Sequence, residues 1–283
     1  MLLRLHHRTE YRYSEAATSN SNELRMTPIT TRWQKLEVNI ISVLPATRLS
    51  SYKDLNQNIV SYFEISEPHS RLVVDSRASV NTSCKVDFGN LPYGYSHSDL
   101  PQCLALEDCY PFLQNSNYIG LTPEAWRLAL DIKGDSQDVF QTSYGIMDYI
   151  YSEYQYDTVA TNVMTHATEI LENKRGVCQD FAHAMVALCR SLRIPARYVS
   201  GYFFDATRDR SLRGSEASHA WAEVYIEPLG WVGLDPTNRK VVDDTYIILA
   251  RGRDYRDVAP VIGSFMGSGR SAMQVTVSVE RDH

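Results

Sequence analysis

The hydrophobic pattern of this chain changes its period near residue 90, and that change limits the folds it can adopt. Residues 1–90 carry alternating, β-branched or aromatic side chains between turn formers, and they show almost no helical periodicity. This pattern predicts a β-rich, sandwich-like domain over residues 1–90. The expected strands run from Leu3 to Tyr13, Asn22 to Met26, Glu37 to Val43, Ile59 to Ile65 and Arg71 to Ser83.

Residues 91–283 mix helical and strand patterns, so we assign the whole chain to the α+β class. Thr122-Pro123-Glu124 supplies an N-cap, a first-turn proline and a first-turn acid for a helix that Gly134 stops. Two more helices are expected, from Asp138 to Glu153 and near Ala167 to Asn173. The second domain, 91–283, is predicted to contain a helical segment at 91–157, a core at 158–250 and a C-terminal strand at 272–279.

A cysteine, Cys178, stands where a further helix is expected to begin. Gly176 precedes it, and Ile194-Pro195 ends the helix. Helix N-termini gather unpaired N–H groups and the positive end of the macrodipole, which favour a thiolate. Cys178 is therefore the candidate nucleophile, whereas Cys189 has the position of an ordinary buried thiol. The apolar stripe of this helix is formed by Phe181, Met185, Leu188 and Leu192.

The helix start is not sufficient to activate this thiol. Asp180 lies in the same first turn, and its carboxylate offsets the field that would stabilise a thiolate. A cationic neighbour is needed, and an imidazolium paired with the thiolate is the usual solution. His183, on the same helix, points about 140° away from Cys178 at ~100° per residue, so we interpret it as a packing or supporting residue.

Two residues of a predicted hairpin supply the missing partners. His219 opens an alternating run that ends at Ile226, and Asp235 closes the run after the turn. If Ile226 paired with Trp231, Asp235 would lie on the opposite face from His219, so a bulge or a shifted register is expected, at Gly233. Alone, a strand histidine is a packing residue and an Asp-Pro is a turn former. Together with the helix cysteine, they predict a Cys-His-Asp catalytic triad.

Four other residues are candidates for the cleft around this triad. Asn162 and Thr165 are candidate oxyanion-hole donors beside the backbone N–H of Cys178, although loop polarity also explains them. Tyr202 and Trp221 are candidates for lining the cleft, with core packing as the alternative.

The sequence implies no metal and no cofactor. Asp205 and Asp209 share one loop without the ligand alternation or central glycine of a calcium loop. A metal site built on Cys178 and His219 lacks two further ligands and ranks third among the interpretations. The five cysteines have no framework spacing in a chain too long to need disulfides, so all are expected to be reduced: Cys84, Cys103, Cys109, Cys178 and Cys189.

Charge and hydropathy argue against two classes of partner. The net charge is −6 and the pI is near 5.8, whereas nucleic acids and anionic membranes attract clustered cations. Charged residues interrupt Met1 to Arg8 too early for a signal peptide, and no apolar run approaches membrane-spanning length. We therefore expect a cytoplasmic protein with no nucleic-acid or membrane partner; its oligomeric state stays open.

Four stretches closely resemble the bacterial transglutaminase-like proteins, which are often described as candidate cysteine proteases. They are residues 176–183 (GVCQDFAH), 194–202 (IPARYVSGY), 219–225 (HAWAEVY) and 230–238 (GWVGLDPTN). Residues 7–13 (HRTEYRY) and 23–28 (ELRMTP) resemble the β-rich domain that commonly precedes the core in this family. The resemblance implies a papain-like core, in which the helix of the nucleophile packs against an antiparallel sheet.

The resemblance also assigns roles, with Cys178 as nucleophile, His219 as base and Asp235 as orienting acid. The expected reaction is acyl transfer on an amide of a peptide or protein substrate, through a thioester. A protease or amidase is favoured because water is always present as the acceptor. A protein-glutamine transglutaminase or deamidase is the alternative, and a non-catalytic peptide-binding or assembly module is the alternative of another class.

Overall fold

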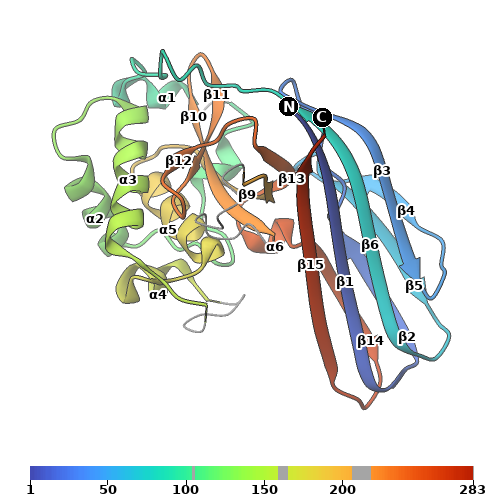
Figure 1. Cartoon of the computed structure of the whole chain (residues 1–283). Coiled ribbons are helices and arrows are strands. Elements are labelled where there is room, and N and C mark those ends of the chain that lie inside the picture. Colours follow the sequence, from blue (N-terminus) through green and yellow to red (C-terminus); the bar gives the residue numbers. More distant parts are fainter. Residues whose placement is uncertain (104–105, 159–164, 206–217, 283) are drawn as a thin grey trace.

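The computed structural model describes residues 1–103, 106–158, 165–205 and 218–282. Figure 1 shows two lobes side by side, one built of long strands and the other of helices around a smaller sheet. This mixture of helices and strands confirms the α+β assignment. Within the described ranges, no helix is long and apolar enough to cross a membrane.

The strand-rich lobe is a sandwich of two four-stranded sheets, in the orders β15-β1-β6-β3 and β14-β2-β5-β4. Alternate residues of its strands are buried, as the sequence pattern predicts. Its core contains Leu24 and Phe63 from one sheet and Leu72 and Val74 from the other. The strands are β1 (Leu2–Ala17), β2 (Ser19–Leu24), β3 (Gln34–Leu44), β4 (Ser50–Lys53), β5 (Ile59–Ile65), β6 (His69–Thr82), β14 (Val261–Met266) and β15 (Ser271–Arg281).

The C-terminal strand lies elsewhere than expected. The sequence placed residues 272–279 in the second domain, whereas β15 pairs with β1 from Leu3 opposite Arg281 to Tyr13 opposite Ser271. Strand β14 pairs with β2 in the other sheet. Alternation shows that a segment is a strand, but it does not show which sheet edge the strand joins. The two C-terminal strands, one in each sheet, therefore complete the sandwich that the N-terminus begins (Figure 1).

The second lobe contains an antiparallel five-stranded sheet in the order β12-β11-β10-β9-β13. Its strands are β9 (Ala196–Phe203), β10 (His219–Ile226), β11 (Gly230–Asp235), β12 (Lys240–Val241) and β13 (Tyr246–Gly252), with a small separate pair formed by β7 (Gln155–Tyr156) and β8 (Arg175–Gly176). Its α-helices are α1 (Leu100–Cys103), α2 (Pro123–Lys133), α3 (Val139–Glu153), α4 (Ala167–Asn173), α5 (Cys178–Ser191) and α6 (Tyr255–Val258), and two 3₁₀ turns lie at η1 (His97–Asp99) and η2 (Tyr110–Leu113).

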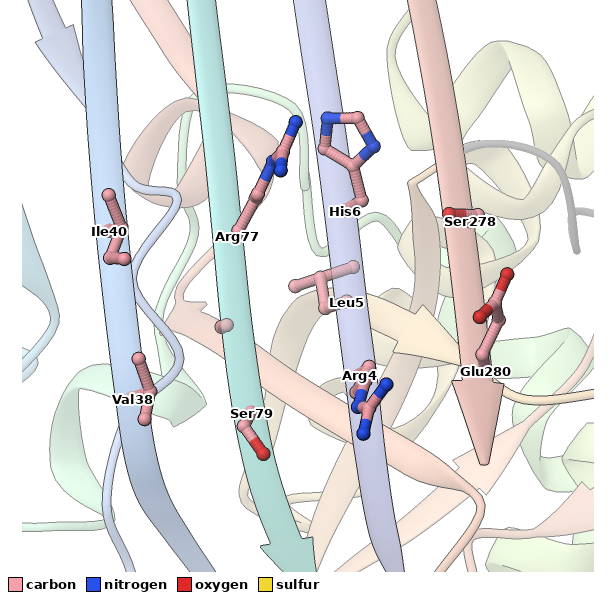
Figure 2. A pocket seen from close by; sticks show the side chains of 10 residues that line it. Arg4, Leu5, His6, Val38, Ile40, Arg77, Ser79, Ser278 and Glu280 are labelled. Atoms are coloured by element: carbon pink, nitrogen blue, oxygen red, sulfur yellow. The ribbon is translucent and has the colours of Figure 1, made fainter. Parts of the chain in front are cut away.

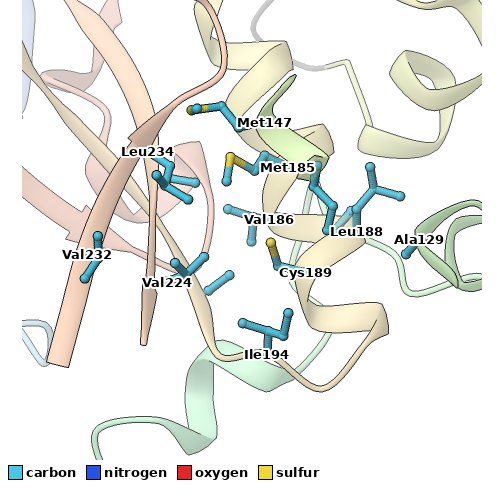
Figure 3. Close-up of a cluster of buried hydrophobic side chains, with 14 of the residues drawn as sticks. Ala129, Met147, Met185, Val186, Leu188, Cys189, Ile194, Val224, Val232 and Leu234 are labelled. Carbon is cyan, nitrogen blue, oxygen red and sulfur yellow. The ribbon is translucent and has the colours of Figure 1, made fainter. Parts of the chain in front are cut away.

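Helix α5 is the centre of this lobe. Every residue from Gln179 to Arg190 is buried, because the sheet covers one side of the helix and α2, α3 and α4 cover the other. Figure 3 shows Met185, Val186 and Cys189 of α5 facing side chains of β10 and β11. The predicted apolar stripe is real, but burial extends all round the helix. A helix fixed on all sides positions its first residue accurately.

The sandwich covers one edge of the five-stranded sheet, the one formed by β13. The Gln34 side chain donates to the carbonyl of Ile248 (2.8 Å) and accepts from its N–H (2.7 Å). The Asn58 side chain makes the same pair of bonds with Arg251, both at 2.8 Å. These amides take the place of a neighbouring strand along β13, so the edge is satisfied without further pairing.

Candidate active site

Cys178 is the first residue of α5, as the sequence predicts, and it is partly buried. The turn into the helix depends on Gly176, whose φ is +155° and whose added Cβ would lie 2.5 Å from Oδ2 of Asp180. That same carboxylate oxygen accepts a hydrogen bond from the Val177 N–H at 2.8 Å. Asp180 therefore holds the segment that enters the helix, a role that our sequence argument about its charge did not include.

The hairpin brings Asp235 to the same face as His219 through its register. Ile226 lies opposite Gly230, and the pairing continues regularly until Ala222 opposite Leu234. The predicted bulge at Gly233 is wrong, and the shifted register is the solution found. Asp235 falls opposite Trp221, which shares a strand face with His219.

Gly233 is required for a different reason from the one we inferred. An added Cβ at this position would lie 2.6 Å from Cβ of Val242. The glycine thus allows the segment after β12 to approach the hairpin closely. The sequence signal at Gly233 was real, but it reported close packing and not an irregular strand.

His219 and Asp235 form a buried hydrogen-bonded pair. Nε2 of the imidazole lies 2.7 Å from Oδ2 of the carboxylate, and both side chains are fully buried. Oδ2 also accepts from the Tyr246 hydroxyl (2.8 Å) and from Nδ2 of Asn238 (3.0 Å). Oδ1 accepts from the Thr237 N–H at 2.9 Å. Donors on both oxygens fix the carboxylate in position.

The electrostatics favour an ionised pair. Burial alone would lower the pKa of His219, but the charge and hydrogen bond of Asp235, together with Cys178, raise it to about 10. Burial would raise the pKa of Asp235, yet His219, Asn238 and Tyr246 lower it below the ordinary value. With Asp235 ionised, Nε2 carries the hydrogen that bonds it.

The other imidazole nitrogen is available for the thiol. Nδ1 of His219 is buried and makes no hydrogen bond of ordinary geometry to any residue that the structure describes. The Cys178 side chain is a neighbour of this imidazole and helps to raise the pKa of the ring. The three predicted residues are thus brought together from α5, β10 and β11.

The four predicted cleft residues have different placements. Asn162 lies outside the described residues, and Thr165 is buried just before α4. Tyr202 is buried, with its hydroxyl bonded to Nδ1 of His7 in the sandwich, so it lies between the lobes. Trp221 is fully buried with its ring centre 6.1 Å from that of His219.

His183 is a packing residue, as expected. Its side chain is fully buried, and Nε2 accepts a hydrogen bond from the Tyr255 N–H at 3.1 Å. Its ring stacks on Tyr118 with 5.6 Å between the centres. Burial, with the charges of Arg190 and His166, lowers the pKa of His183 to about 3, so this imidazole stays neutral.

Two residues of the site, Asn238 and Tyr246, were not predicted from the sequence. Asn238 could have been found, because an Asp followed by a polar residue three positions later is typical of a side-chain-bonded turn. Tyr246 carries no local signal, since it reaches Asp235 only through the pairing of β13 with β9 and β9 with β10. Among the described residues, no group of three or more His, Cys, Asp or Glu side chains could hold a metal ion, and all five cysteines are free.

Comparisons with known proteins agree on the family. Residues 127–236 match the model of the transglutaminase-like superfamily, and residues 3–81 match that of the bacterial transglutaminase-like N-terminal region. An uncharacterized protein of Mycobacterium leprae is 32% identical over 285 residues, covering 99% of this chain and 98% of its own length. A shorter match, 32% identical over 71 residues, joins 24% of this chain to 11% of a protein-glutamine gamma-glutamyltransferase of Pseudomonas aeruginosa.

One solved structure resembles the whole chain. It is a putative cysteine protease from Cytophaga hutchinsonii, with a TM-score of 0.78 and 24% sequence identity. The similarity covers 100% of this chain and 92% of that one. Both lobes therefore share their fold with that protein.

Proposed function

The chain belongs to the transglutaminase-like superfamily, and from that premise we propose that Cys178, His219 and Asp235 carry out thiol-dependent acyl transfer on amide bonds. The family supports a cysteine hydrolase or transferase in general. The observation that carries the specific proposal is the orientation of His219. Nε2 bonds to Asp235, Nδ1 has no hydrogen-bond partner among the described residues, and the Cys178 thiol lies near enough to help raise the pKa of the ring.

The first half of the reaction forms a thioester. The Cys178 thiolate attacks the carbonyl carbon of the amide, and the resulting oxyanion is held by the Cys178 backbone N–H and a second donor. The intermediate collapses as the C–N bond breaks, and Nδ1 of the His219 imidazolium gives its proton to the departing amine. Asp235 keeps the ring oriented and stabilises its cationic form.

The second half decides between a hydrolase and a transferase. If water attacks the thioester, Nδ1 of His219 accepts its proton, a carboxylic acid leaves and the thiolate is restored. If a primary amine attacks, an amide forms instead. We propose hydrolysis of a peptide or protein amide, without a metal, because water needs no acceptor groove. Transglutaminase or deamidase activity is the alternative, and a non-catalytic binding module is the alternative of another class.

Mass spectrometry of a peptide library, incubated with and without a primary amine, tests this proposal. Shortened peptides indicate a protease, a gain of about one dalton on glutamine indicates a deamidase, and amine adducts indicate a transglutaminase. The Cys178→Ala variant should abolish the product, whereas Cys84→Ala, which removes an exposed thiol, should not. A product that persists in Cys178→Ala would refute the proposed mechanism, and the absence of any product would favour the binding module.

A further inference from the structure

A second polar site lies between the lobes, on the face of the five-stranded sheet that turns away from α5. In β10, Ala222, Val224 and Ile226 pack in the same apolar cluster as α5. Glu223 alternates to the opposite face, the one that carries His219. There it lines a cavity of about 260 Å³ that is closed on its other side by residues of the sandwich and of the segment that leaves it. Figure 1 shows this junction of the lobes.

The cavity contains more positive than negative charge. Glu223 lies 2.6 Å from Nη2 of Arg197 and 3.1 Å from Nε of Arg251, so one carboxylate is shared by two guanidinium groups. Lys85 lines the same cavity as a third cation, and Arg32 is a fourth. The other acidic side chain in the lining is that of Asp243, which lies 3.5 Å from Nζ of Lys240.

Lys85 is a cation of this cavity with no carboxylate partner among the described residues. Its ammonium group donates to the backbone carbonyl of Trp231, and among the described residues no carboxylate forms an ion pair with it. Burial, together with the charges of Arg251 and Arg197, lowers the pKa of Lys85 to about 8 despite the proximity of Glu223. A partly buried cation in this situation is stabilised when an anion enters beside it.

The cationic groups are already held in place. The guanidinium of Arg197 lies over the ring of Trp231, 4.1 Å from its centre, and its side chain is 11% exposed. Arg251 is fixed through its backbone by Asn58 and through its side chain by Glu223. An anion would therefore bind without ordering long side chains, which removes a large part of the usual entropic penalty.

We propose that this cavity binds a small anion, with a carboxylate or phosphate group held by Lys85, Arg197 and Arg251. The volume of about 260 Å³ is below the roughly 300–1,000 Å³ of pockets for drug-sized ligands. The site is independent of the proposed acyl transfer, because it uses none of the three reacting residues. Tyr246 nevertheless lines this cavity and also bonds Asp235, so the two sites share one wall.

Thermal unfolding in the presence of inorganic phosphate or succinate, against sodium chloride at matched ionic strength, tests the proposal. At about ten times its dissociation constant, a bound anion should raise the unfolding midpoint by about 3 °C. Lys85→Gln should abolish this rise, whereas Lys53→Gln, at an exposed position of the sandwich, should retain it. Lys85 forms no ion pair in the described structure, so its substitution should leave the fold intact.

The outcomes separate the ligand classes. A response to phosphate alone identifies a phosphoryl ligand, a response to succinate alone identifies a carboxylate, and a response to both identifies a general anion site. Isothermal titration of the wild-type protein with the same two anions gives a second measurement and should show one site per chain. No response beyond that to chloride, or an equal response in Lys85→Gln, would overturn the proposal.

Discussion

At the scale of single residues, the site depends on how firmly Asp235 is held. Its two oxygens accept hydrogen bonds from His219, Tyr246, Asn238 and Thr237. The sequence predicted His219 and Asp235 because each stands at the end of a strand in one hairpin. It could not predict Tyr246, which lies on the edge strand β13, two strands away from β10 in the sheet. Contacts between strands distant in sequence depend on strand order, which the local pattern does not contain.

Replacing Asp235 by asparagine should reduce turnover more than substrate binding. The amide keeps the shape of the side chain but cannot stabilise the imidazolium, and it can impose the wrong tautomer on His219. We expect kcat to fall by about 10²–10⁴-fold with KM nearly unchanged. Steady-state kinetics on a substrate from the peptide library measures both constants. An unchanged kcat would show that Asp235 does not orient a reacting base.

The His219–Asp235 pair should also make stability depend on pH. The folded-state pKa of His219, about 10, is above its ordinary value of 6.5. A raised pKa means that the stabilisation is fully present below pH 6.5 and is lost as the pH rises through about 10. The difference in unfolding free energy between wild type and His219→Gln should therefore shrink from pH 6 to pH 10. Urea unfolding at both pH values checks this, and a constant difference would contradict the assignment.

At the scale of elements, helix α5 was predicted best and the hairpin register worst. The start of α5 at Cys178 follows from a glycine before it and apolar periodicity after it, which are local signals. The register depends on the turn, where Ile226 lies opposite Gly230 and not opposite Trp231. A change of one residue there moves Asp235 from one face to the other, so the residues of the site could be predicted from the sequence but their pairing could not.

The turn into α5 predicts a specific sensitivity at Gly176. Alanine there would have a Cβ 2.5 Å from Oδ2 of Asp180, at a φ of +155°. We expect Gly176→Ala to lower the free energy of unfolding by about 2 kcal/mol and to reduce activity, because Cys178 would move. Gly120→Ala is the matched control, since its added Cβ has no contact closer than 3.9 Å. Equal midpoints of urea unfolding for the two variants would contradict this account of the turn.

At the scale of the whole molecule, the two ends of the chain together build one lobe, and the middle of the chain builds the other lobe beside it. Strands β14 and β15 return from the second lobe to pair with β2 and β1. The sequence identified a β-rich region at 1–90 and a C-terminal strand, yet not that they share a sandwich. The peptide or protein substrate, the cytoplasmic location and the lack of nucleic-acid or membrane partners stay predictions of the sequence.

Removing residues 261–283 should therefore damage the N-terminal lobe. Strands β1 and β2 would become free edges, and apolar residues of the sandwich would be exposed. We expect an unfolding midpoint at least about 10 °C lower and self-association in size-exclusion chromatography. Removing only residues 282–283 deletes the Arg4–Asp282 ion pair, whose arginine is 65% exposed, and should change little. A monomeric shortened chain with an unchanged midpoint would contradict this description of the fold.

The central claim is that His219 activates Cys178, and the rate of Cys178 alkylation by iodoacetamide at pH 6 tests it most directly. Mass spectrometry of the modified peptides gives separate rates for Cys178, for exposed Cys84 and for Cys189, whose pKa burial raises to about 12. We predict that Cys178 reacts at least about tenfold faster than Cys84 and that His219→Gln removes this advantage. A Cys178 that reacts no faster than Cys84, or equally fast without His219, would contradict the claim.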